Sequence, residues 1–198
     1  ENFVDYIERY QYDLNSVIEE SIYETNSLLL KKMPTLIEYA AFFGSYHIVD
    51  YLFLRGVQLT SSLWIYGIHG NNSEIIHLLQ DNAVPPSDNT YEECLKESIK
   101  CHHNRFATHI YSNLLDETVE SNNIKNNNSN NLYSYCFHYY NFIYFPEVLD
   151  NSDFIFSYAC NYDYFEIVKT ILKSKRTDFK NKYVCNNFFF NPIFKYFF

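Results

Sequence analysis

Apolar pairs recur along the chain, and each is followed by another apolar residue about one helical turn later. The clearest copies are Ile48-Val49 with Leu52, Ile75-Ile76 with Leu79, and Ile167-Val168 with Ile171; weaker copies are Phe106-Ala107 with Ile110 and Tyr144-Phe145 with Val148. Such positions lie on one face of an α-helix and bury it against a neighbour. The pattern therefore predicts an amphipathic helix at each copy.

A small residue stands eight positions before each apolar pair. These residues are Ala40, Gly67, Ser98, Cys136 and Ala159. A small side chain in the middle of a first helix lets a neighbouring backbone approach, while the second helix fills the space between layers. The spacing is close to that of helix-pair repeats of about 33 residues. Helix pairs are thus predicted near 34–57, 61–83, 91–115, 132–150 and 153–174.

The segment FGSYH, residues 43–47, predicts the turn inside the first complete pair. Gly44 can adopt the left-handed backbone conformation that ends many helices. Ser45 then stands where a side-chain hydroxyl can cap the second helix, and Gly56 is expected to end that helix. The stretch 34–57 is therefore predicted to be one helix-turn-helix unit, and not a catalytic glycine loop.

The same repeat register also leads to predictions for the two ends of the chain and for the segments between repeats. The segment FVDYI, residues 3–7, matches the second helix of an upstream repeat, which predicts a partial repeat at 1–10 and a chain that starts inside a repeat. A loop and then a short helix near 26–32 should follow. The Asn-rich segment 121–131 is expected to be an insertion loop, and 177–198 an irregular tail.

The line TLIEYAAFFGSYHIVDYLFLRGV resembles an ankyrin repeat, whose pattern runs Thr-Pro-Leu-His, two Ala, Gly-His, Ile-Val, Leu-Leu and Gly-Ala. The matching residues are Thr35, Ile37, Ala40, Ala41, Gly44, Ile48, Val49, Leu52 and Gly56. Leu36, Glu38 and Ser45 depart from it, at its Pro, its first His and its second His. Four later stretches extend this resemblance to a large family of divergent ankyrin-like proteins from single-celled eukaryotes that carry a domain of unknown function. They are SLWIYGIHGNNSEIIHLL, TYEECLKESIKCHHNRFATHI, FHYYNFIYFPEVL and YACNYDYFEIVKTIL.

The resemblance covers roughly residues 1–175 and implies an all-α, ankyrin-like solenoid over 1–176, with stacked helix pairs and with hairpins reduced or absent. It also implies a non-catalytic scaffold that binds a protein partner along a concave face. That face is lined by the residues just after each small position and by the loop tips. The residues expected to bind the partner are Phe42, Phe43, His69, Lys100, His102, His103, Asn161 and Tyr162. Packing between irregular repeats is the alternative use of Phe42 and Phe43.

Composition and charge narrow the class of protein and its partners. The chain has 20 Tyr and 18 Phe but only 4 Gly and 5 Pro, and so few Gly and Pro favour long uninterrupted elements over a turn-rich β-sandwich. A net charge of −9 weighs against nucleic acid as a partner. No apolar run reaches the roughly 20 residues of a membrane span. Five scattered cysteines and no secretory signal predict an intracellular, cytoplasmic protein; the oligomeric state stays open.

The densest set of chemically capable residues is CLKESIKCHHNRFATH. It holds Cys94, Cys101, His102, His103 and His109. Thiolates and imidazoles are ligands that zinc prefers, but the segment lacks a C-x-x-C pair. Turn or groove histidines are therefore the favoured interpretation, and the sequence predicts no metal, no cofactor and no catalytic group. The alternative is a metal- or ligand-binding enzyme centred on Cys94, Cys101, His102 and His103.

Overall fold

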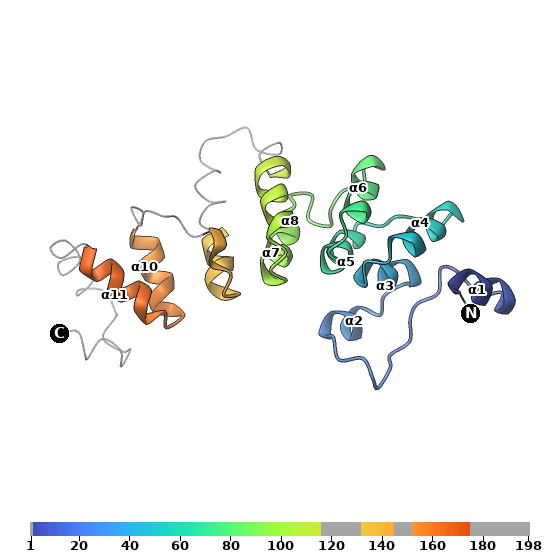
Figure 1. The fold of residues 1–198 in the computed structure, drawn as a ribbon, viewed down its shortest axis with the longest axis horizontal. Coiled ribbons are helices and arrows are strands. Elements are labelled where there is room, and N and C mark those ends of the chain that lie inside the picture. The colour runs from blue at the N-terminus through green and yellow to red at the C-terminus, as the bar shows by residue number, and fades with distance from the viewer. Residues whose placement is uncertain (1, 116–131, 145–151, 175–198) are drawn as a thin grey trace. The chain divides into compact units, whose positions relative to one another are not determined.

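Helices make up almost all of the regular structure in the computed structural model of the chain. The structure describes residues 2–115, 132–144 and 152–174. Within these ranges there is no β-strand, and the only strand-like contact is an isolated bridge between Val17 and Thr35. The predicted all-α class is confirmed (Figure 1). No described helix is long and apolar enough to cross a membrane.

The chain divides into an N-terminal unit, residues 1–125, and a C-terminal unit, residues 126–198. The helices of the N-terminal unit are α1 (Phe3–Tyr10), α2 (Ser27–Lys32), α3 (Leu36–Phe42), α4 (Tyr46–Leu54), α5 (Leu63–His69), α6 (Ser73–Asp81), α7 (Glu92–Lys100) and α8 (Asn104–His109), which a π-helical turn, η1 (Ile110–Leu114), continues. The C-terminal unit holds a helix at 132–138, the short η2 (Phe142–Tyr144), α10 (Ser152–Asn161) and α11 (Phe165–Ser174).

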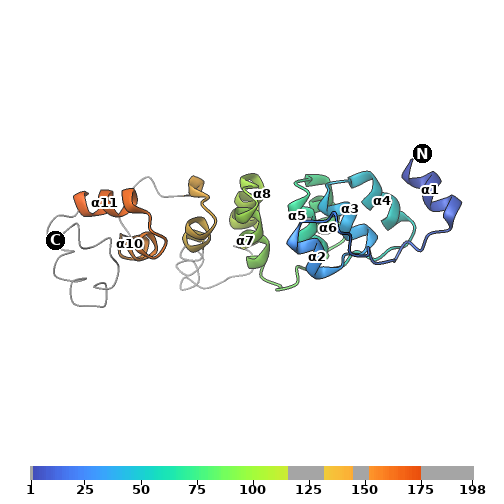
Figure 2. The ribbon, with the colours of Figure 1, turned by 90° about the horizontal axis from the view of Figure 1, so that it is seen from below.

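Consecutive first helices pack against one another in the N-terminal unit. Helix α3 contacts α5, and α5 contacts α7, while each also contacts the second helix of its own pair. The order α3, α5, α7 is visible in Figure 1 and again in the turned view of Figure 2. The N-terminal unit is therefore built of helix pairs layered in chain order.

Each first helix ends in the same kind of turn. The residue four positions after the small residue has a left-handed backbone, with φ between 50° and 65°; these residues are Gly44, Asn71, His102, Tyr140 and Asp163. In most copies the next backbone N–H donates to the carbonyl of the small residue, as from Ser45 to Ala40 at 2.9 Å and from Tyr164 to Ala159 at 2.8 Å. This is the bond pattern that closes a helix at a left-handed residue.

The faces that the apolar spacing predicts are buried. The buried members on the second helices are Val49, Leu52, Ile75, Ile76, Leu79, Ala107, Ile110, Val168 and Ile171, and all of the small residues are buried as well. The copy at Phe145 and Val148 lies outside the described residues, as do the predicted insertion 121–131 and the predicted tail 177–198. Small residues under a neighbouring helix and apolar residues between layers thus account for the packing.

Helix caps differ in part from the sequence prediction. Ser45 stands at the N-cap of α4, as predicted, but its side chain does not make the capping hydrogen bond that this position would allow. At the start of α3 the Glu38 carboxylate accepts the backbone N–H of Thr35 at 2.8 Å. The same carboxylate accepts the hydroxyl of Ser62, which belongs to the next helix pair. Glu38, where the ankyrin pattern has His, therefore ties two layers together.

Helix α1 packs beside the end of α4. The rings of Phe3 and Tyr51 meet edge to face at 6.0 Å, and Arg55 pairs with Glu8 at 3.1 Å. Helix α2 covers most of the range where a short helix was expected, and the side chain of Asn26 caps it. The beginning of the chain inside a repeat stays a prediction.

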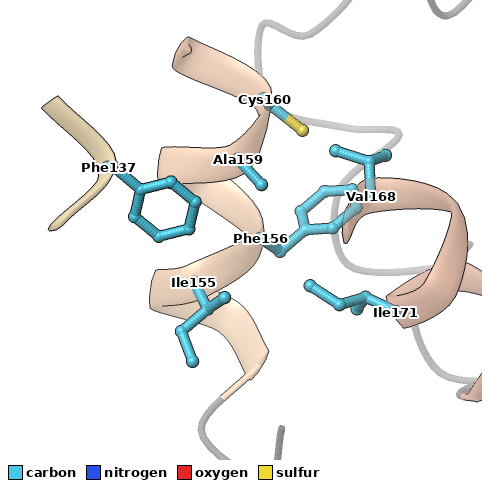
Figure 3. Close-up of a cluster of buried hydrophobic side chains, with 7 residues drawn as sticks. All are labelled: Phe137, Ile155, Phe156, Ala159, Cys160, Val168 and Ile171. Carbon is cyan, nitrogen blue, oxygen red and sulfur yellow. The ribbon is translucent and has the colours of Figure 1, made fainter. Parts of the chain in front are cut away.

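The C-terminal unit has its own apolar core. Figure 3 shows side chains of α10 and α11 directed toward one another, with Phe137 approaching α10 from helix 132–138. The buried members are Phe137, Ile155, Phe156, Ala159, Cys160, Val168 and Ile171. The hydroxyl of Tyr164 donates to the carbonyl of Phe137 at 2.9 Å and so ties the start of α11 to this core.

Candidate functional site

A continuous series of rings crosses the first two helix pairs of the N-terminal unit. Tyr39 and Phe43 have ring centroids 4.9 Å apart, and Phe43 lies 5.1 Å from Phe42. Phe42 stacks on the imidazole of His69, at 4.9 Å and with 26° between the planes. Phe43 is 57% exposed, whereas Phe42 is half-buried. The ring series therefore joins the end of α3 to the end of α5 and shows one phenylalanine to solvent.

The imidazole at the end of this ring series leads to two further polar side chains. His69 Nε2 lies 2.7 Å from Glu97 Oε1, and Cys101 Sγ lies 3.5 Å from His69 Nδ1 and 3.8 Å from Nε2. Lys100 Nζ is also 2.7 Å from Glu97 Oε1. We call His69, Glu97 and Cys101 the α5–α7 triad. It is the only group of three or more His, Cys, Asp or Glu among the described residues with ligand atoms mutually within 4.8 Å.

Two local features place the α5–α7 triad. His69 is the last residue of α5, where it faces α7 because the two helices pack together. Glu97 and Cys101 are four residues apart, so they lie on the same face of α7, with Cys101 at its C-cap. One helix thus supplies two donors and its neighbour the third. The side chains of His69 and Glu97 are each 14% exposed, which leaves the triad within reach of solvent.

Electrostatics set the protonation of the two acidic members. Burial alone would raise the pKa of Glu97, but hydrogen bonds from His69 and Lys100 outweigh it and hold that pKa below its usual value. Burial, reinforced by the charge of Glu97, raises the pKa of the Cys101 thiol to about 11. At neutral pH the triad therefore holds a carboxylate and a protonated thiol.

A thiol that contacts an imidazole, which in turn contacts a carboxylate, is also the arrangement of a nucleophilic catalytic triad. A cysteine nucleophile, however, needs a lowered pKa or a base that removes its proton easily. Cys101 has the opposite shift, since its pKa is raised to about 11. The electrostatics therefore favour a resting thiol over a thiolate nucleophile.

Of the residues expected to bind a partner, the structure brings Phe42, Phe43, His69 and Lys100 together. His102 is exposed at the left-handed turn, and His103 Nδ1 donates to the carbonyl of Ile68 at 2.7 Å. In the C-terminal unit Asn161 is exposed, and the Tyr162 hydroxyl lies 3.1 Å from His138 Nδ1.

The four residues of the alternative, enzymatic interpretation do not gather. Cys94 is buried on α7, two turns or about 10 Å along the axis from Cys101. His102 and His103 occupy the turn and lie outside the α5–α7 triad. His109 contacts Gln80 and Asn113 instead. Cys101 does take part in a polar group, but its partners are His69 and Glu97 rather than Cys94, His102 or His103.

Glu97 is the member of the triad that sequence reasoning missed. Its four-residue spacing to Cys101 was visible, and His69 stands two positions after Gly67, as Lys100 does after Ser98. That equal register relates His69 to Lys100 and not to Glu97, so no signal in the sequence identifies the contact between His69 and Glu97.

No family model matches the chain, and neither a curated protein nor a solved structure matches it. The resemblance to ankyrin-like proteins therefore stays a prediction from the sequence.

Proposed function

We propose that the chain is a non-catalytic scaffold of ankyrin-like helix pairs that binds a protein partner through the side chains of Phe42, Phe43, His69 and Lys100. The observation that carries the proposal is the unbroken ring series from Tyr39 to His69, which spans two helix pairs. We call these four partner-binding side chains the α3–α7 surface.

Exposure and chemistry support this surface as a binding site. Phe43 keeps 57% of its surface exposed although it stands beside two other rings, so the fold leaves apolar area uncovered there. Aromatic residues dominate the binding energy of protein interfaces when a partner covers them. Lys100 and Glu97 add charged groups at the end of the series. An apolar side chain of the partner would pack on Phe43, with polar contacts at its edge.

The architecture and the cysteines support the remaining parts of the proposal. The pairs are joined by loops without strands in the described residues, in keeping with reduced hairpins. The described cysteines Cys94, Cys101, Cys136 and Cys160 are free thiols, which supports a reducing, cytoplasmic setting. The net charge of −9 supports a protein over a nucleic acid as the partner.

The test compares Phe43→Glu with the matched control Leu54→Glu. Both side chains are exposed, at 57% and 74%, but Leu54 lies at the end of α4, away from the ring series. Quantitative cross-linking and mass spectrometry from native extract should recover partners with the wild type and with Leu54→Glu. The same partners should be lost with Phe43→Glu. Phe42 is unsuitable as the first choice because it is half-buried and its replacement would disturb packing.

Circular dichroism and thermal unfolding must first show that both variants are folded. Recovery of an identical set of partners by all three proteins would refute the α3–α7 surface.

A further inference from the structure

We propose that the α5–α7 triad is a binding site for one zinc-class divalent metal ion, with His69 Nε2, a Glu97 carboxylate oxygen and the Cys101 thiolate as ligands. The three donors come from two packed helices, and their ligand atoms all lie within 4.8 Å of one another. This inference does not depend on the proposed scaffold function, although the site shares His69 with the α3–α7 surface.

The distances are close to those that a tetrahedral ion needs. With bonds of about 2.3 Å to sulfur and about 2.1 Å to nitrogen and oxygen, tetrahedral geometry separates sulfur from nitrogen by about 3.6 Å and nitrogen from oxygen by about 3.4 Å. In the structure Cys101 Sγ is 3.8 Å from His69 Nε2, and Glu97 Oε1 is 2.7 Å from the same nitrogen. The sulfur is thus nearly at the required distance from His69 Nε2, whereas the Glu97 oxygen must move about 0.7 Å further from that nitrogen.

The donor set selects the class of metal. Sulfur and imidazole nitrogen are ligands for zinc and similar borderline ions, whereas magnesium and calcium take oxygen ligands. Three protein ligands leave a fourth position for water or for a group from a partner, and the partial exposure of His69 and Glu97 gives the ion a path from solvent.

Protons and charge balance in the bound state. Binding releases the proton of the Cys101 thiol to solvent, and the imidazole proton that points at Glu97 moves to Nδ1 so that Nε2 can ligate. The thiolate and the carboxylate then neutralise the two charges of the ion. Lys100, 2.7 Å from Glu97 Oε1 in the structure, competes with the metal for that oxygen.

The direct test is titration of the full chain with Zn²⁺ under a metal-free phosphine reductant, followed by titration with Co²⁺. We expect one Zn²⁺ per chain. Co²⁺ should give a thiolate-to-cobalt absorption band and the intense visible bands of tetrahedral coordination. Bound Zn²⁺ should also protect Cys101 of the wild-type protein from alkylation. Peptide mass spectrometry measures the alkylated fraction of Cys101 with and without Zn²⁺, so this test needs no substitution.

Matched substitutions locate the site. Cys101→Ser and Glu97→Gln should each weaken Zn²⁺ binding at least tenfold, and Cys101→Ser should abolish the thiolate band. His102→Gln and Glu93→Gln alter an exposed histidine beside the site and an exposed carboxylate on the same helix, and both should bind as the wild type does. Absence of stoichiometric Zn²⁺, a cobalt spectrum without the thiolate band, or unchanged binding by Cys101→Ser would each overturn the proposal.

Discussion

The carbonyl oxygen of Gly70 lies 2.5 Å from the point where a Cβ atom would stand on Gly44. Gly44 closes the turn after α3, and Gly70 is the C-cap of α5, so the turns of consecutive helix pairs are in backbone contact. The side chain of Asn72 strengthens the contact by donating to the carbonyl of Gly44 at 3.0 Å. The space between the two turns therefore has no room for a side chain on Gly44 or on Gly70.

Gly70→Ala should lower the free energy of unfolding by about 1 to 3 kcal/mol, the usual cost of overpacking. Its backbone has φ of −67°, which alanine adopts freely, so the loss comes from contact of the new methyl group with the carbonyl of Ala41. Gly56→Ala is the control, because Gly56 has no neighbour within 4 Å but has φ of +91°. It should cost about 1 kcal/mol for conformation alone. Urea unfolding measures both, and a smaller loss for Gly70→Ala than for Gly56→Ala would contradict the contact.

Asp88→Asn should destabilise the protein at neutral pH and much less in acid. Burial would raise the pKa of Asp88, but backbone N–H groups of Glu93, Thr90 and Tyr91 donate to its carboxylate and hold that pKa below the ordinary value. A lowered pKa in the folded state means that the stabilisation is present above the unfolded pKa and is lost as pH falls through the folded one.

We expect the wild type to exceed Asp88→Asn by about 0.3 to 1 kcal/mol in unfolding free energy at pH 7, the usual contribution of a negative charge near a helix N-terminus. The difference should shrink below about pH 4. Denaturant unfolding at several pH values measures it. A gap of equal size at pH 7 and pH 3 would show that the charge of Asp88 does not matter.

Ala159→Leu should destabilise the C-terminal unit by about 1 to 3 kcal/mol, since a fully buried small residue has no room for three more carbons. Asn161→Leu, at an exposed position of the same helix, should change stability by no more than about 0.5 kcal/mol. Hydrogen exchange of the α11 amides reports the loss for this unit by itself. Equal exchange rates in the two variants would mean that the small residue is not a packing requirement.

The apparent affinity of the α5–α7 triad for Zn²⁺ should rise about tenfold per pH unit near neutral pH, because one thiol proton leaves when the metal binds. Since the pKa of Cys101 is raised to about 11, the proton competes with the metal throughout this range. Titrations at pH 6.5, 7.0 and 7.5 measure the slope. Residual binding by Cys101→Ser should lack it, and an equal slope in that variant would assign the proton to another group.

Helix pairs could be predicted from the sequence because a small residue and an apolar pair eight positions later constrain local structure strongly. The turn at Gly44 was visible for the same reason, since glycine favours a left-handed backbone. The equivalent turns at His102 and Tyr140 could not be predicted from the sequence. A left-handed backbone is less favourable for these residues than for glycine, and they adopt it only because the helix ends require it.

The candidate site was predictable in part. Phe42, Phe43, His69 and Lys100 stand two or three positions after the small residues, so the register alone places them near one another. Glu97 resembles any charged residue on a solvated helix face, and its contact with His69 depends on how α5 lies against α7. Contacts between layers are set by tertiary packing, which a single repeat does not encode.

The repeated left-handed turn separates backbone geometry from side-chain identity. Glycine, asparagine, histidine, tyrosine and aspartate all occupy the same place, and the last four are exposed there. The helix ends therefore determine the shape of the turn, and the residue at its tip is interchangeable at the four exposed positions but not at Gly44, where Gly70 excludes a side chain. Within each unit, evolution or a protein engineer can rewrite what the exposed turns display, one tip at a time, and leave the layering of the helices as it is.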